Sequence, residues 1–196
     1  MEDTTEINKN RLDLDLKQSI WLFGYGSLIF KADFPYMERK PAGIQGWIRR
    51  FWQGSHDHRG TPDSPGRAVT LIESENEVCY GVAYKIKINT LEKLDYREKN
   101  GYLRFFADLR FEDGEYDQGL VYIATPQNGA FLGKASEKDI AKLILVASGA
   151  SGTNLEYFKN LYFALDEMNA LDSHMLRINS YIEETLKFRG FLNNRL

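Results

Sequence analysis

A short glycine-containing stretch offers the clearest chemistry in the sequence. It follows an apolar run at residues 20–23, which is typical of a buried strand, and it reads Gly24-Tyr25-Gly26-Ser27-Leu28-Ile29. Glycines permit positive φ and leave backbone N–H groups uncovered, so an anionic group can approach closely. Ser27 adds a hydroxyl that can donate or accept a hydrogen bond. The stretch therefore predicts a ligand-binding loop, with a plain tight turn as the alternative.

One carboxylate, that of Glu98, is the second candidate for chemistry. It shares one face of a predicted short helix, at positions i, i+3, i+4 and i+7, with Leu91, Leu94 and Asp95. Glu98 should therefore point inward, and neither Leu94 nor Tyr102, four residues away on each side, can form a salt bridge with it. The negative end of the helix dipole and partial desolvation would both raise its pKa. These conditions suit a general base; the alternative is that Glu98 pairs with an arginine of a neighbouring strand.

Other common site chemistries fit the sequence poorly. The histidines, His56, His58 and His174, do not follow metal-ligand spacing, and a single cysteine provides no Cys pair, so we expect no metal. Ser27 does not stand in a Gly-x-Ser-x-Gly motif, which argues against a serine nucleophile. The loop lacks the third glycine of a dinucleotide site and the acidic residue about 20 positions further on. Cys79 lies in the middle of a predicted strand, where it is expected to be a small buried apolar residue.

Composition limits the size and the partners of the protein. A chain of 196 residues with 43% hydrophobic residues suffices for one domain, and a net charge of −3 argues against nucleic acid as a partner. The single cysteine, together with the absence of an Asn-x-Ser/Thr acceptor, favours the cytoplasm. The first residues are acidic, and no apolar run could cross a bilayer, so no membrane partner is expected. We expect a monomer.

The sequence predicts a leader, then strands and then helices, and these elements must position the candidate residues. Residues 1–18 alternate charges with isolated leucines and predict a flexible acidic leader, and residues 19–196 predict a single domain. Hydrophobic patterns predict strands over residues 20–23, 42–52, 67–73, 78–86, 103–111 and 118–125.

Two predicted hairpins and a polar loop connect these strands. Residues 74–77 and 112–115 form the turns of the hairpins, and residues 53–66 form a polar loop. Asn89 can cap the short helix that carries Glu98. Strands followed by helices predict an α+β domain with a curved or closed, antiparallel-rich sheet.

Three helices are predicted in the last third of the chain. Ser136 with Asp139 is typical of the start of one helix, and Thr153 with Glu156 of the start of the next. A third helix follows over residues 171–186. These helices should flank the sheet.

Seven segments, read in order, resemble one known family. They are FGYGSLI at 23–29, RRFWQGS at 49–55, DHRG at 57–60, PGR at 65–67, GVAY at 81–84, DYREKNGY at 95–102 and SGTNLEY at 151–157. In this order they are similar to the ChaC family of γ-glutamylcyclotransferases, in its glutathione-specific branch. The resemblance implies a mixed β-barrel flanked by helices and a cofactor-independent cyclisation of the γ-glutamyl group of glutathione, giving 5-oxoproline and Cys-Gly.

The resemblance also implies roles for particular residues. Glu98 would be the catalytic acid/base, and the loop of Gly24, Tyr25, Gly26, Ser27, Leu28 and Ile29 would bind the substrate. Apart from the resemblance, we hypothesise that Tyr25 and Tyr157 wall the pocket and that an arginine such as Arg59 meets the glycine carboxylate of glutathione. Two alternatives stay open: the same chemistry on other γ-glutamyl amino acids or amines, and a non-catalytic module that binds an anionic metabolite or peptide.

Overall fold

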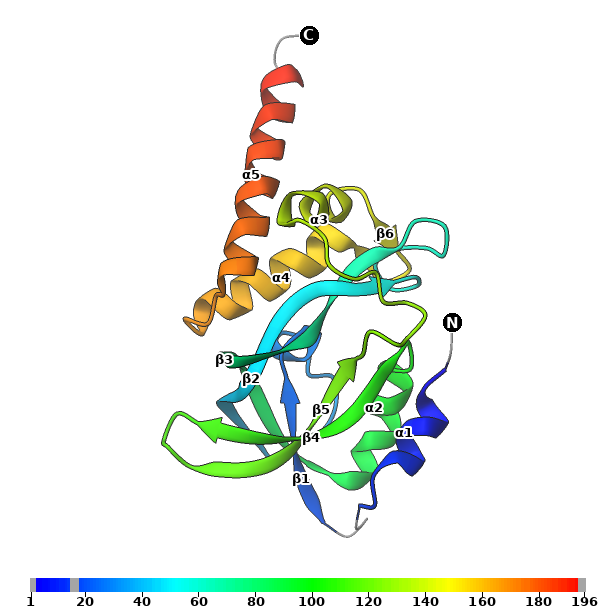
Figure 1. Ribbon diagram of the computed structural model, residues 1–196, viewed down its shortest axis with the longest axis vertical. Coiled ribbons are helices and arrows are strands. Elements are labelled where there is room, and N and C mark those ends of the chain that lie inside the picture. Colours follow the sequence, from blue (N-terminus) through cyan, green and yellow to red (C-terminus); the bar gives the residue numbers. More distant parts are fainter. Residues whose placement is uncertain (1–2, 15–17, 194–196) are drawn as a thin grey trace.

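Five strands close into a barrel within residues 3–14 and 18–193, the part of the chain that the computed structural model describes (Figure 1). The strands are β1 (Ser19–Gly24), β2 (Glu38–Ser55), β3 (Gly66–Lys87), β4 (Tyr102–Phe111) and β5 (Tyr116–Ala124). Their order around the barrel is β1-β3-β2-β4-β5, and a parallel pairing of β1 with β5 closes it, whereas the other pairings are antiparallel. This architecture confirms the predicted α+β fold with a closed, antiparallel-rich sheet.

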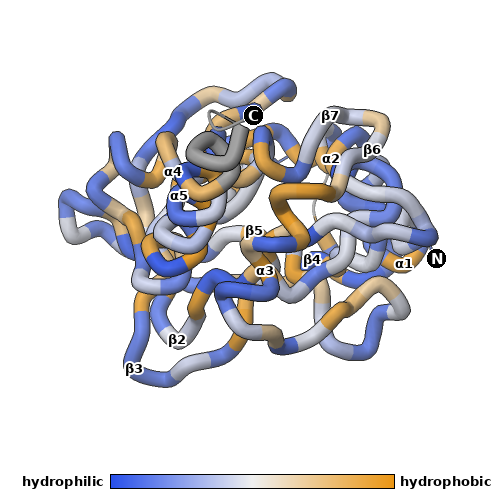
Figure 2. The backbone as a smooth tube through the Cα atoms, turned by 90° about the horizontal axis from the view of Figure 1, so that it is seen from above, coloured by the Kyte–Doolittle hydropathy of each residue, from blue (hydrophilic) through white to orange (hydrophobic). Residues whose placement is uncertain are grey.

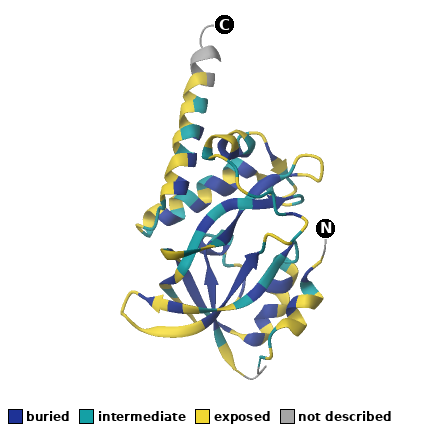
Figure 3. Cartoon of the chain, viewed as in Figure 1, coloured by how far each residue is buried: buried dark blue, intermediate teal, exposed yellow. Residues whose placement is uncertain are grey.

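Strand β1 is a barrel strand whose second half is buried, and it leads into the glycine loop. It pairs with β3 on one side and with β5 on the other, and the consecutive residues Leu22 and Phe23 are both buried. A strand covered on both faces has an uninterrupted apolar sequence instead of an alternating one, as residues 20–23 do. Figure 3 shows that much of the length of the barrel strands is buried, and Figure 2 shows hydrophilic residues prevailing in the outer loops.

The predicted hairpin over residues 67–86 is wrong. Strand β3 runs unbroken through this region, and both of its halves pair with β2 instead of with each other. Residues 74–77 form only a local excursion opposite Gly46, where the register shifts from Gln45–Val78 to Trp47–Glu73. The tetrapeptide Ser-Glu-Asn-Glu lacks the glycine of a tight hairpin turn, so nothing in it forces the chain to reverse. The long β2–β3 ribbon is joined by residues 56–65 instead.

Five α-helices surround the barrel in the described part of the chain. They are α1 (Thr5–Arg11), α2 (Leu91–Arg97), α3 (Glu137–Ile144), α4 (Asn154–Glu167) and α5 (Ser173–Asn193). The last three gather over one end of the barrel, and α5 extends beyond the body (Figure 1). No helix in the described ranges has both the length and the apolar character that crossing a membrane requires.

Local capping patterns predict the starts of α3 and α4 correctly but not the start of α2. As predicted, Ser136 accepts a hydrogen bond from the Asp139 N–H at the start of α3. Thr153 accepts one from the Glu156 N–H at the start of α4. The predicted Asn89 cap of α2 is wrong, because a 3-10 turn over Ile88–Thr90 leads directly into this helix without a side-chain cap.

The described part of the leader is anchored to the barrel, which differs from the flexible attachment that we expected. Thr4 donates a hydrogen bond to the Lys99 carbonyl at 2.9 Å. Asn8, which is 0% exposed, donates to the Tyr102 carbonyl at 3.0 Å and accepts from the Arg104 N–H at 2.9 Å. Hydrophobic periodicity did not reveal this anchor, because its groups are polar. Residues 1–2 and 15–17 of the predicted leader lie outside the described residues.

Replacing Asn8 tests this anchor. Asn8→Ala leaves the buried Arg104 N–H without its partner and removes one of the two side-chain donors to the Tyr102 carbonyl, which keeps the Thr4 hydroxyl. We therefore expect a loss of about 1–3 kcal/mol in the free energy of unfolding. Asn10→Ala on the same helix removes an exposed side chain and should change it by less than about 0.5 kcal/mol. Urea unfolding of both variants measures the difference, and equal losses would contradict the anchor.

Candidate functional site

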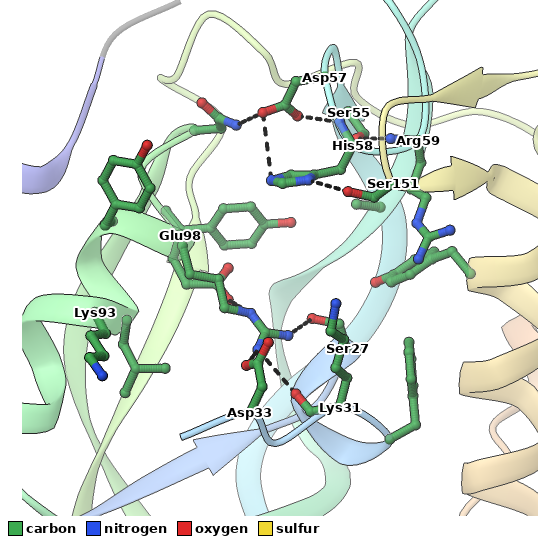
Figure 4. Close-up of a pocket in the computed structure, with 18 of the residues that line it drawn as sticks. Ser27, Lys31, Asp33, Ser55, Asp57, His58, Arg59, Lys93, Glu98 and Ser151 are labelled. Carbon is green, nitrogen blue, oxygen red and sulfur yellow. Dashed lines mark hydrogen bonds and ion pairs between the residues drawn. The ribbon is translucent and has the colours of Figure 1, made fainter. Parts of the chain in front are cut away.

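A cavity of about 440 Å³ opens beside α2, and Glu98 lies in its wall (Figure 4). It adjoins a narrower recess whose walls include the glycine loop, and both spaces are lined by Ser27, Glu98, Tyr102 and Tyr157. Figure 4 shows Glu98 between Asp57 and His58 on one side and Ser27 and Asp33 on the other. Volumes of about 300–1,000 Å³ are typical of small-molecule sites. The predicted loop and the predicted carboxylate are therefore walls of one space.

Buried side chains bind two carbonyl groups of the glycine loop. The Arg49 Nε–H donates to the Tyr25 carbonyl at 2.7 Å, and the Tyr84 hydroxyl donates to the Leu28 carbonyl at 2.8 Å. A single 3-10 turn (Ser27–Ile29) follows, and the first N–H groups of such a turn have no partner within it. Those of Ser27 and Leu28 find no acceptor among the described residues. They are thus available to a ligand.

The two glycines of the loop are needed for space and not for positive φ. Neither adopts a positive φ, which corrects the expectation from the sequence. A Cβ at Gly24 would lie 2.7 Å from Leu28 Cβ, and one at Gly26 would lie 2.7 Å from Val69 Cγ2. Only without side chains at these positions can the loop fold back so that Leu28 lies over Gly24 and Val69 packs against Gly26.

Arg49 fixes the loop from inside the protein. It is 2% exposed, and besides the Tyr25 carbonyl it contacts Asp172 at 3.2 Å and the Tyr80 carbonyl. Its guanidinium also lies 3.6 Å from the Cys79 sulfur, and burial raises the pKa of this thiol. Cys79 is 3% exposed, as expected for a small core residue.

Glu98 ends helix α2 on the inward side. Leu91, Leu94 and Asp95 of the same face are buried, and the Glu98 side chain is 15% exposed. Burial raises the pKa of its carboxyl above the ordinary value of 4.5; Arg97 opposes this shift, and Asp33 adds to it. A desolvated carboxylate facing a cavity is suited to moving protons.

The sequence did not reveal that Arg97 is the ion-pair partner of Glu98. Its Nε lies 3.3 Å from Glu98 Oε1, although neighbouring residues of a helix do not normally face each other. They meet here because the helix stops at Arg97, and Glu98 has non-helical angles of φ −96° and ψ 12°. The same guanidinium donates to Ser27 Oγ at 2.9 Å and also binds Asp33. One cation thus links the glycine loop with the carboxylate.

A network of polar side chains forms the opposite wall. Asn100 donates to the Asp57 carboxylate, and a hydrogen bond of 2.8 Å joins His58 Nδ1 to Ser151 Oγ. The backbone is tied as well, since the Ala150 N–H donates to the Asp57 carbonyl at 2.8 Å. Sequence reasoning assigned His58 only a general polar role, because its partners are remote in the chain. The loop after β2 is therefore a packed wall of the cavity.

The other predicted site residues are only partly brought together. Tyr157 and Arg59 both line the cavity, and the Arg59 guanidinium lies 5.8 Å from the Tyr157 ring centre. Arg59 NH1 also contacts Glu156 at 3.3 Å. Tyr25 and Leu28 line the recess, whereas Ile29 is packed in the core and lies outside the lining.

Comparisons with known proteins agree on one family. The family model "ChaC-like protein" matches residues 20–185. "Gamma-glutamylcyclotransferase 2-3" of Arabidopsis thaliana is 44% identical over 180 residues, covering 86% of this chain and 90% of that protein. "Glutathione-specific gamma-glutamylcyclotransferase 1" of Danio rerio is 40% identical over 182 residues, covering 87% and 92%. A crystal structure of a yeast γ-glutamyl cyclotransferase specific to glutathione superposes with a TM-score of 0.76 at 31% identity, covering 84% of this chain and 97% of that one.

The buried Glu98 carboxylate predicts a pH-dependent stability difference. Because its pKa in the folded state is raised above 4.5, the charged form destabilises the fold as pH rises through that pKa, and the effect disappears below the ordinary value. Glu98→Gln should therefore have a higher Tm than the wild type at about pH 7 and nearly the same Tm at about pH 4. Thermal unfolding by circular dichroism measures both.

The exposed Glu167 of α4 provides the matched control for this measurement. Glu167→Gln should leave Tm nearly unchanged at both pH values, since exposed substitutions have small effects. A Glu98→Gln variant that is less stable than the wild type at neutral pH would show that the carboxylate is stabilised, and not desolvated, in its site.

Proposed function

The chain belongs to the ChaC-like protein family, and from this membership we propose that it converts glutathione into 5-oxoproline and Cys-Gly. Relatives from animals and yeast that carry glutathione-specific names support the substrate. The observation that carries the proposal is one recess whose lining includes the desolvated Glu98 together with Ser27 and Leu28, whose N–H groups have no acceptor among the described residues.

The proposed reaction is an intramolecular cyclisation. The α-nitrogen of the γ-glutamyl group attacks its own γ-carbonyl carbon, a C–N bond closes a five-membered ring, and the bond to the cysteinyl nitrogen breaks. The α-ammonium nitrogen loses two protons and the leaving nitrogen gains two, so the reaction is balanced without a co-reactant. Holding a near-attack conformer of such a substrate can contribute up to about 7–11 kcal/mol.

Glu98 is proposed to carry the protons. A carboxylate whose pKa is raised by burial accepts a proton from the α-nitrogen more readily than an ordinary glutamate and can return it to the leaving nitrogen. Its place at the junction of the cavity and the recess supports access to both nitrogens.

The glycine loop and the cavity walls are proposed to hold the substrate. The free N–H groups of Ser27 and Leu28 are suited to a developing oxyanion on the γ-carbonyl, and Tyr157 bounds the space beside them. Arg59 has five N–H donors, and its contacts at NH1 leave others for the glycine carboxylate of glutathione.

The proposal requires neither a cofactor nor a second subunit. Proton transfer, oxyanion stabilisation and substrate binding are all assigned to side chains and backbone groups of one chain, which supports a monomer as the working unit. We also propose a cytoplasmic location, a compartment in which glutathione helps to keep thiols reduced.

Incubation of the purified protein with glutathione tests the reaction and the role of Glu98 together. Mass spectrometry should detect 5-oxoproline and Cys-Gly from the wild type without added metal or nucleotide. Glu98→Gln should fold but lose at least about 10²–10⁴-fold in kcat, the usual contribution of a general acid/base. A variant that retains more than about a tenth of the wild-type rate would exclude Glu98 from this role.

A substrate panel distinguishes the proposal from its alternatives. Turnover of glutathione well above that of γ-glutamylalanine supports glutathione specificity, and the reverse order favours another γ-glutamyl substrate. Binding of glutathione without any product would favour a non-catalytic module. The inward Glu98 argues against such a module, since a desolvated carboxylate weakens the binding of an anion.

Arg59→Gln tests the place of the glycine carboxylate. Loss of one charge-assisted contact should raise KM for glutathione about 10-fold or more and change kcat little. Arg177→Gln removes an exposed arginine of α5 and should leave both constants unchanged. An unchanged KM for Arg59→Gln would move the carboxylate to another cation of the cavity.

A further inference from the structure

The substrate itself constrains which cation can lie near Glu98. In a γ-glutamyl group, the α-amine and the α-carboxylate are bonded to the same carbon. If the amine is to reach Glu98, the group that binds the carboxylate must lie directly beside this residue. Among the described residues, Arg97 is the cation that forms an ion pair with Glu98, at 3.3 Å. The other cations of the cavity wall, Lys31, Arg59 and Lys93, form none with it.

Hydrogen-bond donors converge around this guanidinium. Arg97 NH2 donates to Ser27 Oγ at 2.9 Å, and since the serine oxygen accepts this bond, its own hydrogen can be donated to a ligand. The backbone N–H groups of Ser27 and Leu28 lie in the same loop without acceptors among the described residues. A guanidinium and a hydroxyl side by side are suited to a carboxylate, and the two N–H groups stay available for the γ-carbonyl oxygen.

The guanidinium of Arg97 already forms an ion pair with one carboxylate of the protein. Asp33 binds Arg97 NH1, although the Asp33 side chain is 55% exposed and lies on an irregular segment. Arg97 itself is 21% exposed and lines the cavity, so a ligand can reach it. NH2 has one hydrogen bond, to Ser27, and hence one N–H left over. The site can therefore hold a ligand carboxylate next to Glu98.

We propose that Arg97, together with Ser27, binds the α-carboxylate of the γ-glutamyl group and thereby directs the α-amine to Glu98. This inference rests on the proposed function and defines its substrate class as γ-glutamyl compounds with a free α-carboxylate. It also separates the two carboxylates of glutathione: Arg97 takes the one beside the reacting nitrogen, and Arg59 takes the one at the glycine end.

Two carboxamide analogues of glutathione test this assignment, one amidated at the α-carboxylate and one at the glycine carboxylate. The wild type should lose about 10- to 100-fold in kcat/KM on the α-amide, the scale of a charged hydrogen-bonded contact. Arg97→Gln should lose a similar factor on glutathione but little more on the α-amide, because the interaction is already absent. The glycine amide should lower kcat/KM by the same factor in both proteins.

Controls keep this test decisive. Arg110→Gln, which removes an exposed arginine of β4, should discriminate against the α-amide as the wild type does. If Arg97→Gln does not fold, Arg97→Met allows the same comparison, since it keeps an unbranched apolar stem and removes the charge. If the Arg97 variant prefers glutathione over the α-amide as strongly as the wild type does, the carboxylate-binding role of Arg97 is overturned, and the proposed function is unaffected. A wild type that forms no 5-oxoproline from glutathione overturns the proposed function and this inference with it.

Discussion

One buried guanidinium, that of Arg49, connects the parts of the molecule on which the site depends. It holds the Tyr25 carbonyl of the glycine loop, the Tyr80 carbonyl of β3 and the carboxylate of Asp172. Asp172 in turn accepts the His174 N–H at 3.0 Å in the first turn of α5. A buried charge is tolerated only when its donors are satisfied. The loop, the barrel and the C-terminal helix must therefore adopt their observed arrangement together.

The parts of the fold that were predicted correctly depend on local sequence. The β4–β5 hairpin and the Ser136 and Thr153 caps need only residues a few positions apart, and all three are observed. Two of the failures, the hairpin and the loose leader, depend on remote partners. Residues 67–86 were predicted to be a hairpin because their pairing partner, the long strand β2, lies outside this segment of the sequence. Helix α1 appeared loose because its anchor, Asn8, binds residues almost a hundred positions later.

The site residues, too, divide into those that local sequence patterns reveal and those that only the folded structure reveals. The glycine loop and Glu98 could be identified from spacing, because a strand followed by glycines and a helix face are local patterns. Arg97 could not, since its contact with Glu98 arises only where the helix ends. The wall around Asp57 depends on backbone packing: a Cβ at Gly60 would lie 2.0 Å from the Gly66 nitrogen. A sequence shows such glycines but not what they touch.

The burial of Cys79 has a consequence for the redox state of the protein. Thiol–disulfide exchange needs an accessible thiolate, and this sulfur is sealed beneath Arg49 with a raised pKa. A protein that binds glutathione also meets its oxidised form, which would form a mixed disulfide with any exposed thiol. Since Cys79 is the one cysteine of the chain, the protein offers no site for S-glutathionylation. Its own thiol chemistry therefore leaves it insensitive to the ratio of reduced to oxidised glutathione.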